Sequence, residues 1–276
     1  MPCISPIHIN DKDGRREVPC GRCVYCMKRK RLEWTTRLLI ESTNSVIPPV
    51  MVTLTYDDEH IPIDENGDTV VNKKDIQDFF KRLRYYVPEN FKYFIASEYG
   101  PRNLRPHYHA ILFNFPQKYV TEEFIEKVWT KGFCTCGIAT DGGISYCAKY
   151  VSFRSQDFGK RPNFMLASRR PAIGKCYLDR LNLLKWHNSN LFDNNYIQIN
   201  SNKFPVPRYL KEKIYSKLDR KLMNEHYELY VKPYLMEEIY DRIERKLNGD
   251  NVTTIDDQIE LDNRKYYKSL KKQKDI

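Results

Sequence analysis

Residues 91–115 read FKYFIASEYGPRNLRPHYHAILFNF, two runs of β-forming residues on either side of a loop that contains glycine and proline. The runs at 91–99 and 107–115 predict two strands, because both are rich in aromatic and large apolar residues. The loop at 100–106 is short, so the two strands are expected to pair as an antiparallel hairpin. This stretch therefore predicts the centre of an antiparallel sheet.

The segments on either side predict the rest of one α+β unit. Residues 51–56, MVTLTY, predict a further strand that ends at two aspartates. A helix is predicted at 73–87, because Asn72 suits its N-cap and apolar residues recur on one face. The remaining predicted elements are a helix at 121–131, a strand at 133–139 and a helix at 145–153. Since helices that pack on an antiparallel sheet bury its apolar face, we expect an α+β fold.

Three parts are predicted along the chain. Residues 1–45 hold four cysteines and then a basic amphipathic stretch at 27–42, which is typical of a helix. Residues 46–155 contain the α+β unit. Residues 156–276 are expected to be basic and mainly helical.

The composition favours a polyanionic partner. The 276-residue chain has a formal net charge of +10, and residues 154–185 alone carry eight Lys/Arg against two Asp. It also contains 20 Tyr, 13 Phe and 3 Trp, whose rings can stack on unpaired bases. A basic, aromatic-rich surface suits single-stranded nucleic acid better than an acidic small molecule. Six further Lys/Arg at 264–274 predict additional nonspecific affinity for DNA.

No run of the sequence approaches the roughly 20 apolar residues of a membrane span, and the first residues, MPCISPIHIN, lack the pattern of a signal peptide. The sequence therefore predicts a protein of the cytosol without a membrane partner. In a reducing compartment, its eight cysteines are expected to be thiols or metal ligands rather than disulfides.

The triplet His107-Tyr108-His109 opens the second strand of the hairpin. Because side chains alternate along a strand, the two histidines share a face and Tyr108 points the other way. Antiparallel pairing can bring the carboxylate of Glu98, near the end of the first strand, beside the histidine pair. Two nitrogens and one oxygen suit Mg²⁺, Mn²⁺ or another divalent cation. The alternative for a His-x-His pair is two ordinary histidines on a half-buried strand.

The sequence Tyr146-Cys147-Ala148-Lys149-Tyr150 forms a second motif. On a helix, residues four apart face the same way, so both phenols are expected to project together with Lys149 adjacent. A tyrosine has a pKa near 10 and attacks phosphorus well only if a metal or a cation assists. The histidine cluster and Lys149 could give that assistance. Packing of an aromatic-rich helix is the alternative.

The cysteines near the N-terminus form a third candidate site. Cys20, Cys23 and Cys26 make a Cys-x-x-Cys-x-x-Cys run, and Cys3 lies upstream across the turn-like stretch at 11–14. If residues 3–20 fold back as a hairpin, Cys3 returns beside Cys20 and a four-thiolate Zn²⁺ site becomes possible. The alternative is a set of reduced cysteines packed against the helix that follows.

Basic residues flank both motifs and are candidates for contacts with DNA phosphates. Arg102 and Arg105 precede the histidines in the hairpin loop, while Lys160, Arg161, Arg169 and Arg170 follow the tyrosine motif. Solvated surface charge is the alternative for each of them.

Taken in order, the motifs of this sequence resemble those of the HUH endonucleases, named for His-hydrophobic-His. The matching segments are Val52-Thr53-Leu54-Thr55-Tyr56, then Glu98 with His107-Tyr108-His109, then Tyr146-x-x-Lys149-Tyr150. Further segments resemble the replication initiators of Microviridae, the small single-stranded DNA phages, especially the gokushovirus type. These are Cys20-Gly21-Arg22-Cys23, Thr55-Tyr56-Asp57-Asp58-Glu59-His60 and Ser168-Arg169-Arg170-Pro171-Ala172-Ile173-Gly174, where Ala172 replaces the family's usual Gly.

The resemblance implies a nickase that starts rolling-circle replication on single-stranded phage origin DNA. By position, Glu98, His107 and His109 match the family's metal ligands, Tyr146 and Tyr150 its paired nucleophiles, and Lys149 the lysine that accompanies them. It implies a fold related to the RNA-recognition and ferredoxin-like arrangement, a 5′-phosphotyrosine intermediate, and later rejoining of the product. It also implies host helicase and DNA polymerase partners in the cytoplasm of an infected bacterium.

Two other functions fit the same sequence. A non-enzymatic DNA- or RNA-binding regulator would bind in a salt-sensitive way without cutting. A plasmid relaxase or a transposase of the same superfamily would cut, but at other sites. Cleavage assays on candidate origins separate these functions.

Overall fold

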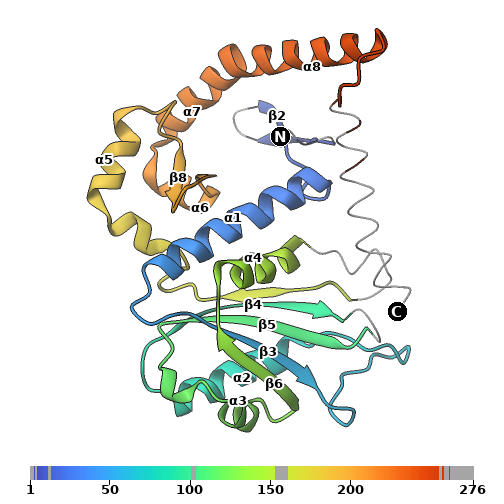
Figure 1. Ribbon diagram of the computed structural model, residues 1–276, viewed down its shortest axis with the longest axis vertical. Coiled ribbons are helices and arrows are strands. Elements are labelled where there is room, and N and C mark those ends of the chain that lie inside the picture. The colour runs from blue at the N-terminus through green and yellow to red at the C-terminus, as the bar shows by residue number, and fades with distance from the viewer. Residues whose placement is uncertain are drawn as a thin grey trace. The chain divides into compact units, whose positions relative to one another are not determined.

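The computed structural model describes residues 3, 5–11, 14–100, 104–152, 161–254, 257 and 261. The chain forms two compact units, the first reaching Tyr177 and the second beginning at Leu178 (Figure 1). The predicted boundaries at 45/46 and 155/156 remain predictions. No helix in the described part of the chain combines the length and apolar content that a membrane span requires.

The first unit is built on a five-stranded antiparallel sheet, with strand order β6-β3-β5-β4-β7. The predicted hairpin is confirmed, since β4 pairs with β5 along its whole length. The short edge strand β7 was not predicted, because three residues are too few for an alternating pattern. The strands are β3 (Val50–Tyr56), β4 (Lys92–Tyr99), β5 (Pro106–Phe113), β6 (Gly132–Ile138) and β7 (Met165–Ala167).

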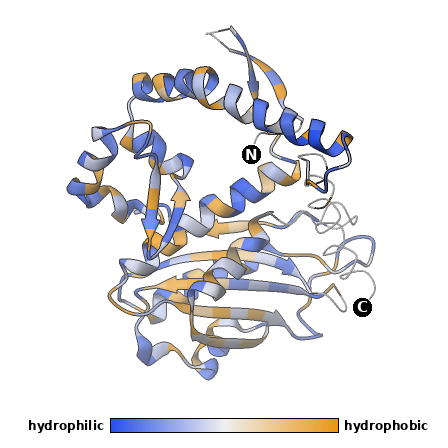
Figure 2. Cartoon of the chain, turned by 45° about the horizontal axis from the view of Figure 1, so that its top comes forward, coloured by the Kyte–Doolittle hydropathy of each residue, from blue (hydrophilic) through white to orange (hydrophobic). Residues whose placement is uncertain are grey.

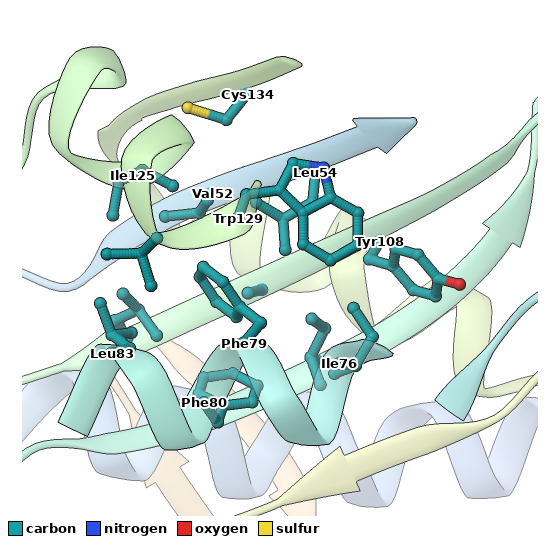
Figure 3. Packing of buried hydrophobic residues seen from close by; sticks show 14 of the residues in the cluster. Val52, Leu54, Ile76, Phe79, Phe80, Leu83, Tyr108, Ile125, Trp129 and Cys134 are labelled. Atoms are coloured by element: carbon teal, nitrogen blue, oxygen red, sulfur yellow. The ribbon is translucent and has the colours of Figure 1, made fainter. Parts of the chain in front are cut away.

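Two helices, α2 (Lys73–Tyr86) and α3 (Glu122–Trp129), cover one face of the sheet (Figure 1). Val52 and Leu54 of β3 meet Phe79 of α2 and Trp129 of α3 there, and all four side chains are fully buried (Figure 3). As predicted, the side chain of Asn72 caps α2 by accepting a hydrogen bond from the amide of the second helical residue. Figure 2 shows hydrophobic residues concentrated in the strands above this core. The α+β fold is confirmed.

The opposite face of the sheet carries α1 (Val24–Thr43) and α4 (Asp141–Lys149) (Figure 1). The prediction of a basic helix before the sheet is confirmed. Helix α4 begins four residues earlier than predicted, because the side chain of Thr140 caps it by accepting from the Gly143 amide. Its α-helical part ends before Tyr150, which begins a 3₁₀ turn, Tyr150–Ser152.

The Cys-rich start of the chain folds as a hairpin of β1 (Ile7–Asp11) and β2 (Gly14–Val18). The expected return of the chain from Cys3 to Cys20 is therefore present. The cysteine run then leads directly into α1, whose N-cap residue is Cys23.

The second unit is mainly helical, as predicted, and also contains a small hairpin of β8 and β9. Its helices carry hydrophilic residues over much of their length (Figure 2). The elements are α5 (Leu181–Ser189), β8 (Tyr196–Ile199), β9 (Asn202–Pro205), α6 (Arg208–Ile214), α7 (Lys217–His226), a π-helical segment (Tyr227–Val231) and α8 (Lys232–Leu247). Short 3₁₀ segments elsewhere in the chain are Gln117–Tyr119 and Lys175–Asp179.

Candidate active site

Strand β5 directs its histidines and its tyrosine to opposite faces of the sheet. Tyr108 is fully buried in the core, where its hydroxyl lies 3.0 Å from the hydroxyl of Tyr56 and accepts a 2.8 Å bond from the Asn72 amide. His107 and His109 therefore point to the face that carries α1 and α4, as the alternation along the strand predicted.

Two threonines of β3 hold the two imidazoles. The register of the sheet pairs Thr53 with His109 and Thr55 with His107. The threonine hydroxyls lie 3.1 Å and 3.0 Å from the Nδ1 atoms of their partners. Because both Nδ1 atoms are held from behind, both Nε2 atoms remain as the outward nitrogens. Holding one ring nitrogen is how proteins orient histidine ligands.

Glu98 of β4 contacts the histidine diagonal to it. Its cross-strand partner is His107, yet its Oε2 lies 2.8 Å from Nε2 of His109. Both side chains of this contact are only 9% exposed. The sequence predicted a carboxylate beside the histidine pair, and the structure places it against His109.

Two imidazoles and a carboxylate suit a divalent cation, but Glu98 and His109 are hydrogen-bonded to each other rather than arranged with His107 around one point. The Glu98–His109 hydrogen bond does not include His107, and that bond must open for the three side chains to share an ion. The threonine hydroxyls permit this, because a hydroxyl can donate or accept and so supports either histidine tautomer.

Local packing keeps the His107 imidazole neutral and in place. Burial lowers the pKa of His107 from its ordinary 6.5, and the nearby His109 and Arg105 lower it further, against the opposing effect of Glu98. Gly100 lies so close to this ring that a Cβ added there would be 2.6 Å from Nε2. Gly100 is therefore part of the site, although a glycine has no functional group that would mark it as such in the sequence.

The paired tyrosines lie over the same face. The ring of Tyr150 stacks on His109, with centroids 4.9 Å apart and planes within 11°. The ring of Tyr146 lies 5.6 Å from that of His109 and 5.1 Å from that of Tyr150. The structure therefore brings together the imidazoles, the carboxylate and both phenols, as the motifs predicted.

The two phenols differ in environment. Tyr146 is 44% exposed, whereas Tyr150 is 4% exposed. Burial raises the pKa of the Tyr150 phenol well above its ordinary range, and the charge of Glu98 with hydrogen bonds to Tyr146 and Glu98 raises it further. Tyr146 lies within α4, while Tyr150 lies in the turn that ends it.

The remaining predicted residues lie around the site or outside the described part of the chain. Lys149 is exposed at the end of α4. Arg105 donates to the backbone carbonyl of Tyr56 at 2.8 Å and pairs with Asp58, so it fastens the end of β3. Arg161, Arg169 and Arg170 are exposed, and Arg102 and Lys160 lie outside the described residues.

The cysteine prediction has a geometric basis as well. The sulfurs of Cys3, Cys20, Cys23 and Cys26 all lie within 4.8 Å of one another, so the cluster could bind a metal such as zinc.

Sequence reasoning assigned no role to Thr53, Thr55 or Gly100. The threonines could have been found from strand alternation, since Thr-x-Thr on one strand and His-x-His on its neighbour match in period. The contact of Gly100 with His107 depends on the path of the loop, for which the sequence carries no comparable signal.

Comparison with known proteins finds similarity in the same part of the chain. The family model for replication-associated protein ORF2/G2P matches residues 49–154, which include the strand, histidine and tyrosine motifs. The part of the chain that carries these motifs is therefore similar to a family of replication-associated proteins.

Three phage and virus proteins are similar over most of the chain. They are replication-associated protein ORF2 of Spiroplasma virus 4 (28% identical, covering 78% of this chain and 72% of the relative), VP4 of Bdellovibrio phage phiMH2K (31%, 70% and 66%) and ORF4 of Chlamydia phage 1 (26%, 82% and 61%). No solved structure matches the chain.

Proposed function

We propose that this protein initiates rolling-circle replication by nicking single-stranded phage origin DNA through a tyrosine. The observation that carries the proposal is the meeting of both phenols with His109 and its partner Glu98 on one face of the sheet. The names of the relatives support a role in replication. Two phenols beside two imidazoles and a carboxylate suit transfer of a phosphoryl group to tyrosine.

The reaction follows from the residues present. A divalent cation such as Mg²⁺ or Mn²⁺, held by Glu98, His107 and His109, would supply positive charge at a non-bridging oxygen of the scissile phosphate. The tyrosine hydroxyl attacks in line, so a bond forms between its oxygen and phosphorus while the bond to the 3′ oxygen breaks. The phenol loses its proton, and the departing oxygen gains one. The products are a 5′-phosphotyrosine and a free 3′-OH.

The covalent bond to tyrosine allows the strand to be rejoined without ATP. Attack of a 3′-OH on the phosphotyrosine restores a phosphodiester and frees the phenol, since the energy of the original bond was conserved. The second tyrosine can cut a regenerated origin, and the 3′-OH that it releases then closes the circle. Lys149 follows Tyr146 by three residues, and we assign it the role of stabilising a phenolate.

The two tyrosines are proposed to act in a fixed order. Tyr146 is the accessible phenol, so it attacks first. Tyr150 is buried, and burial together with the charge of Glu98 raises the pKa of its phenol, so it acts second.

Cofactors and partners follow the same reasoning. Oxygen and imidazole ligands suit Mg²⁺ or Mn²⁺ at the sheet, whereas four thiolates select Zn²⁺ at the cysteine cluster. The sequence contains no Gly-x-x-x-x-Gly-Lys-Ser/Thr loop for ATP, so unwinding is assigned to a host helicase and synthesis to a host DNA polymerase. These steps take place in the cytoplasm of the infected bacterium. Exposed Arg169 and Arg170, with Arg102, Lys160 and Arg161, are candidates for contacts along the DNA backbone.

The test is formation of a covalent adduct. Purified protein is incubated with circular single-stranded phage DNA and Mn²⁺, and the attached peptide is identified by mass spectrometry. The expected peptide contains Tyr146 or Tyr150, and Tyr85→Phe, which alters an exposed tyrosine of α2, is expected to react normally. An adduct formed by the Tyr146→Phe, Tyr150→Phe double variant would refute the mechanism. Binding without any cleavage would favour a non-enzymatic regulator.

A further inference from the structure

The four cysteines near the N-terminus have the spacing of metal ligands rather than of separate thiols. The sulfur of Cys3 lies 3.4 Å from that of Cys20 and 3.7 Å from that of Cys23, and the sulfurs of Cys20 and Cys26 are 4.0 Å apart. In a tetrahedral zinc site with bonds of about 2.3 Å, the sulfurs are about 3.8 Å apart. These three separations bracket this value, whereas a disulfide would bring two sulfurs to about 2.05 Å apart.

The backbone around the cluster is arranged to stabilise thiolates. The amides of Arg22 and Cys23 donate to the sulfur of Cys20 at 3.4 Å and 3.3 Å, and the amide of Cys20 donates to the sulfur of Cys3 at 3.3 Å. The turn that permits this passes through Gly21, whose φ of +71° is the left-handed region that favours glycine.

The start of α1 provides a further favourable environment. Its N-cap residue, Cys23, makes no side-chain hydrogen bond to the helix, and the first turn contains no acidic residue. The positive end of the helix dipole therefore faces the sulfurs of Cys23 and Cys26 without another anion nearby in the turn.

We infer that Cys3, Cys20, Cys23 and Cys26 bind one Zn²⁺ as thiolates, and that this ion fastens the β1–β2 hairpin to the start of α1. Binding replaces the remaining thiol protons with the metal, so it involves no oxidant or reductant. Four thiolates select Zn²⁺ over the oxygen-seeking ions of the catalytic proposal.

Zinc binding would have a structural consequence for the first turns of α1. The end of this helix is held by core packing, since Leu38 is fully buried and Leu39 and Ile40 nearly so. Residues 28–31, Lys-Arg-Lys-Arg, are all exposed. The zinc site lies before this basic turn, so the ion joins the start of α1, where Tyr25 and Cys26 are buried, to the β1–β2 hairpin.

The inference deepens the zinc assignment made with the proposed function, and it can be tested separately from cleavage, because zinc binding requires neither DNA nor a tyrosine. Protein purified without chelator is expected to contain about one zinc per chain. Replacement by Co²⁺ is expected to give thiolate-to-cobalt charge-transfer absorption and the intense visible bands of a tetrahedral sulfur site. Cys20→Ser and Cys23→Ser are each expected to lose most of the metal. The control variant Cys136→Ser changes a half-buried cysteine of β6 and is expected to keep it.

The spectrum of the wild-type protein tests the inference even if the cysteine variants fold poorly. Absence of bound zinc after reconstitution, or a cobalt spectrum without thiolate bands, would overturn it. Retention of a full equivalent of zinc by the folded Cys20→Ser variant would overturn it as well. Failure of DNA cleavage has no bearing on these measurements.

Discussion

Replacing Thr53 by valine isolates the contribution of one hydroxyl to the site. Valine keeps the branched shape, but it removes the oxygen that lies 3.1 Å from Nδ1 of His109. His109 is only 7% exposed, so water cannot readily replace that partner. A buried polar group left without its partner costs about 1–3 kcal/mol. Loss of a residue that orients a metal-binding histidine typically costs about 10–100-fold in metal affinity or activity, which corresponds to about 1.4–2.7 kcal/mol.

The free-energy cost of the unpartnered group and the cost of losing an orienting residue overlap. Thr53→Val is therefore expected to raise the Mn²⁺ concentration for half-maximal cleavage by at least about tenfold. The assay is single-turnover cleavage of single-stranded DNA across a Mn²⁺ titration, with the melting temperature measured in parallel. The control is Thr135→Val, because Thr135 pairs with Thr53 across the sheet but is exposed on β6. An unchanged Mn²⁺ requirement in Thr53→Val, with the fold intact, would refute the assigned role of the hydroxyl.

Three further outcomes are expected. Tyr146→Phe should abolish the first covalent adduct in a single-turnover gel assay while Tyr150→Phe retains it, and the reverse pattern would show that accessibility does not set the order. Gly100→Ala should reduce cleavage, because its Cβ meets Nε2 of His107 at 2.6 Å, whereas Gly137→Ala, with open space at that position, should not; equal activities would contradict the contact. Cation-dependent cleavage should persist below pH 6.5 and fall only as pH drops through the lowered pKa of His107, because that imidazole binds metal when neutral. The unfolded chain takes up this proton near pH 6.5, so folding stability should decline as pH falls from about 6.5 to the lowered pKa of His107. A loss of cleavage centred above pH 6.5 would argue against His107 as the titrating group.

The histidine face could be predicted because strand alternation leaves little freedom. Once residues 91–115 form a hairpin, His107 and His109 must share a face and Tyr108 must enter the core. The cap at Asn72 was predictable for a similar local reason, since its side chain needs only the amides of its own helix.

The pairing of Glu98 with His109 could not be predicted in the same way. Register places Glu98 opposite His107, and only side-chain rotamers and packing choose the diagonal partner. The unequal exposure of the tyrosines was also hidden, because it depends on which side chains pack over each ring. The spacing of Tyr146 and Tyr150 assumes one continuous helix, whereas Tyr150 begins a 3₁₀ turn.

Strand β5 serves the core and the candidate site at once, which limits how this protein can change by insertion or deletion. Loss of one residue within β5 would turn an imidazole into the core and Tyr108 out of it, which would also remove the hydroxyl that bonds to the start of α2. The loop before the strand is different, because a 2.8 Å bond from the Gly100 amide to the Arg105 carbonyl closes it at its base. Length variation is therefore expected inside that loop and not in the strand that follows.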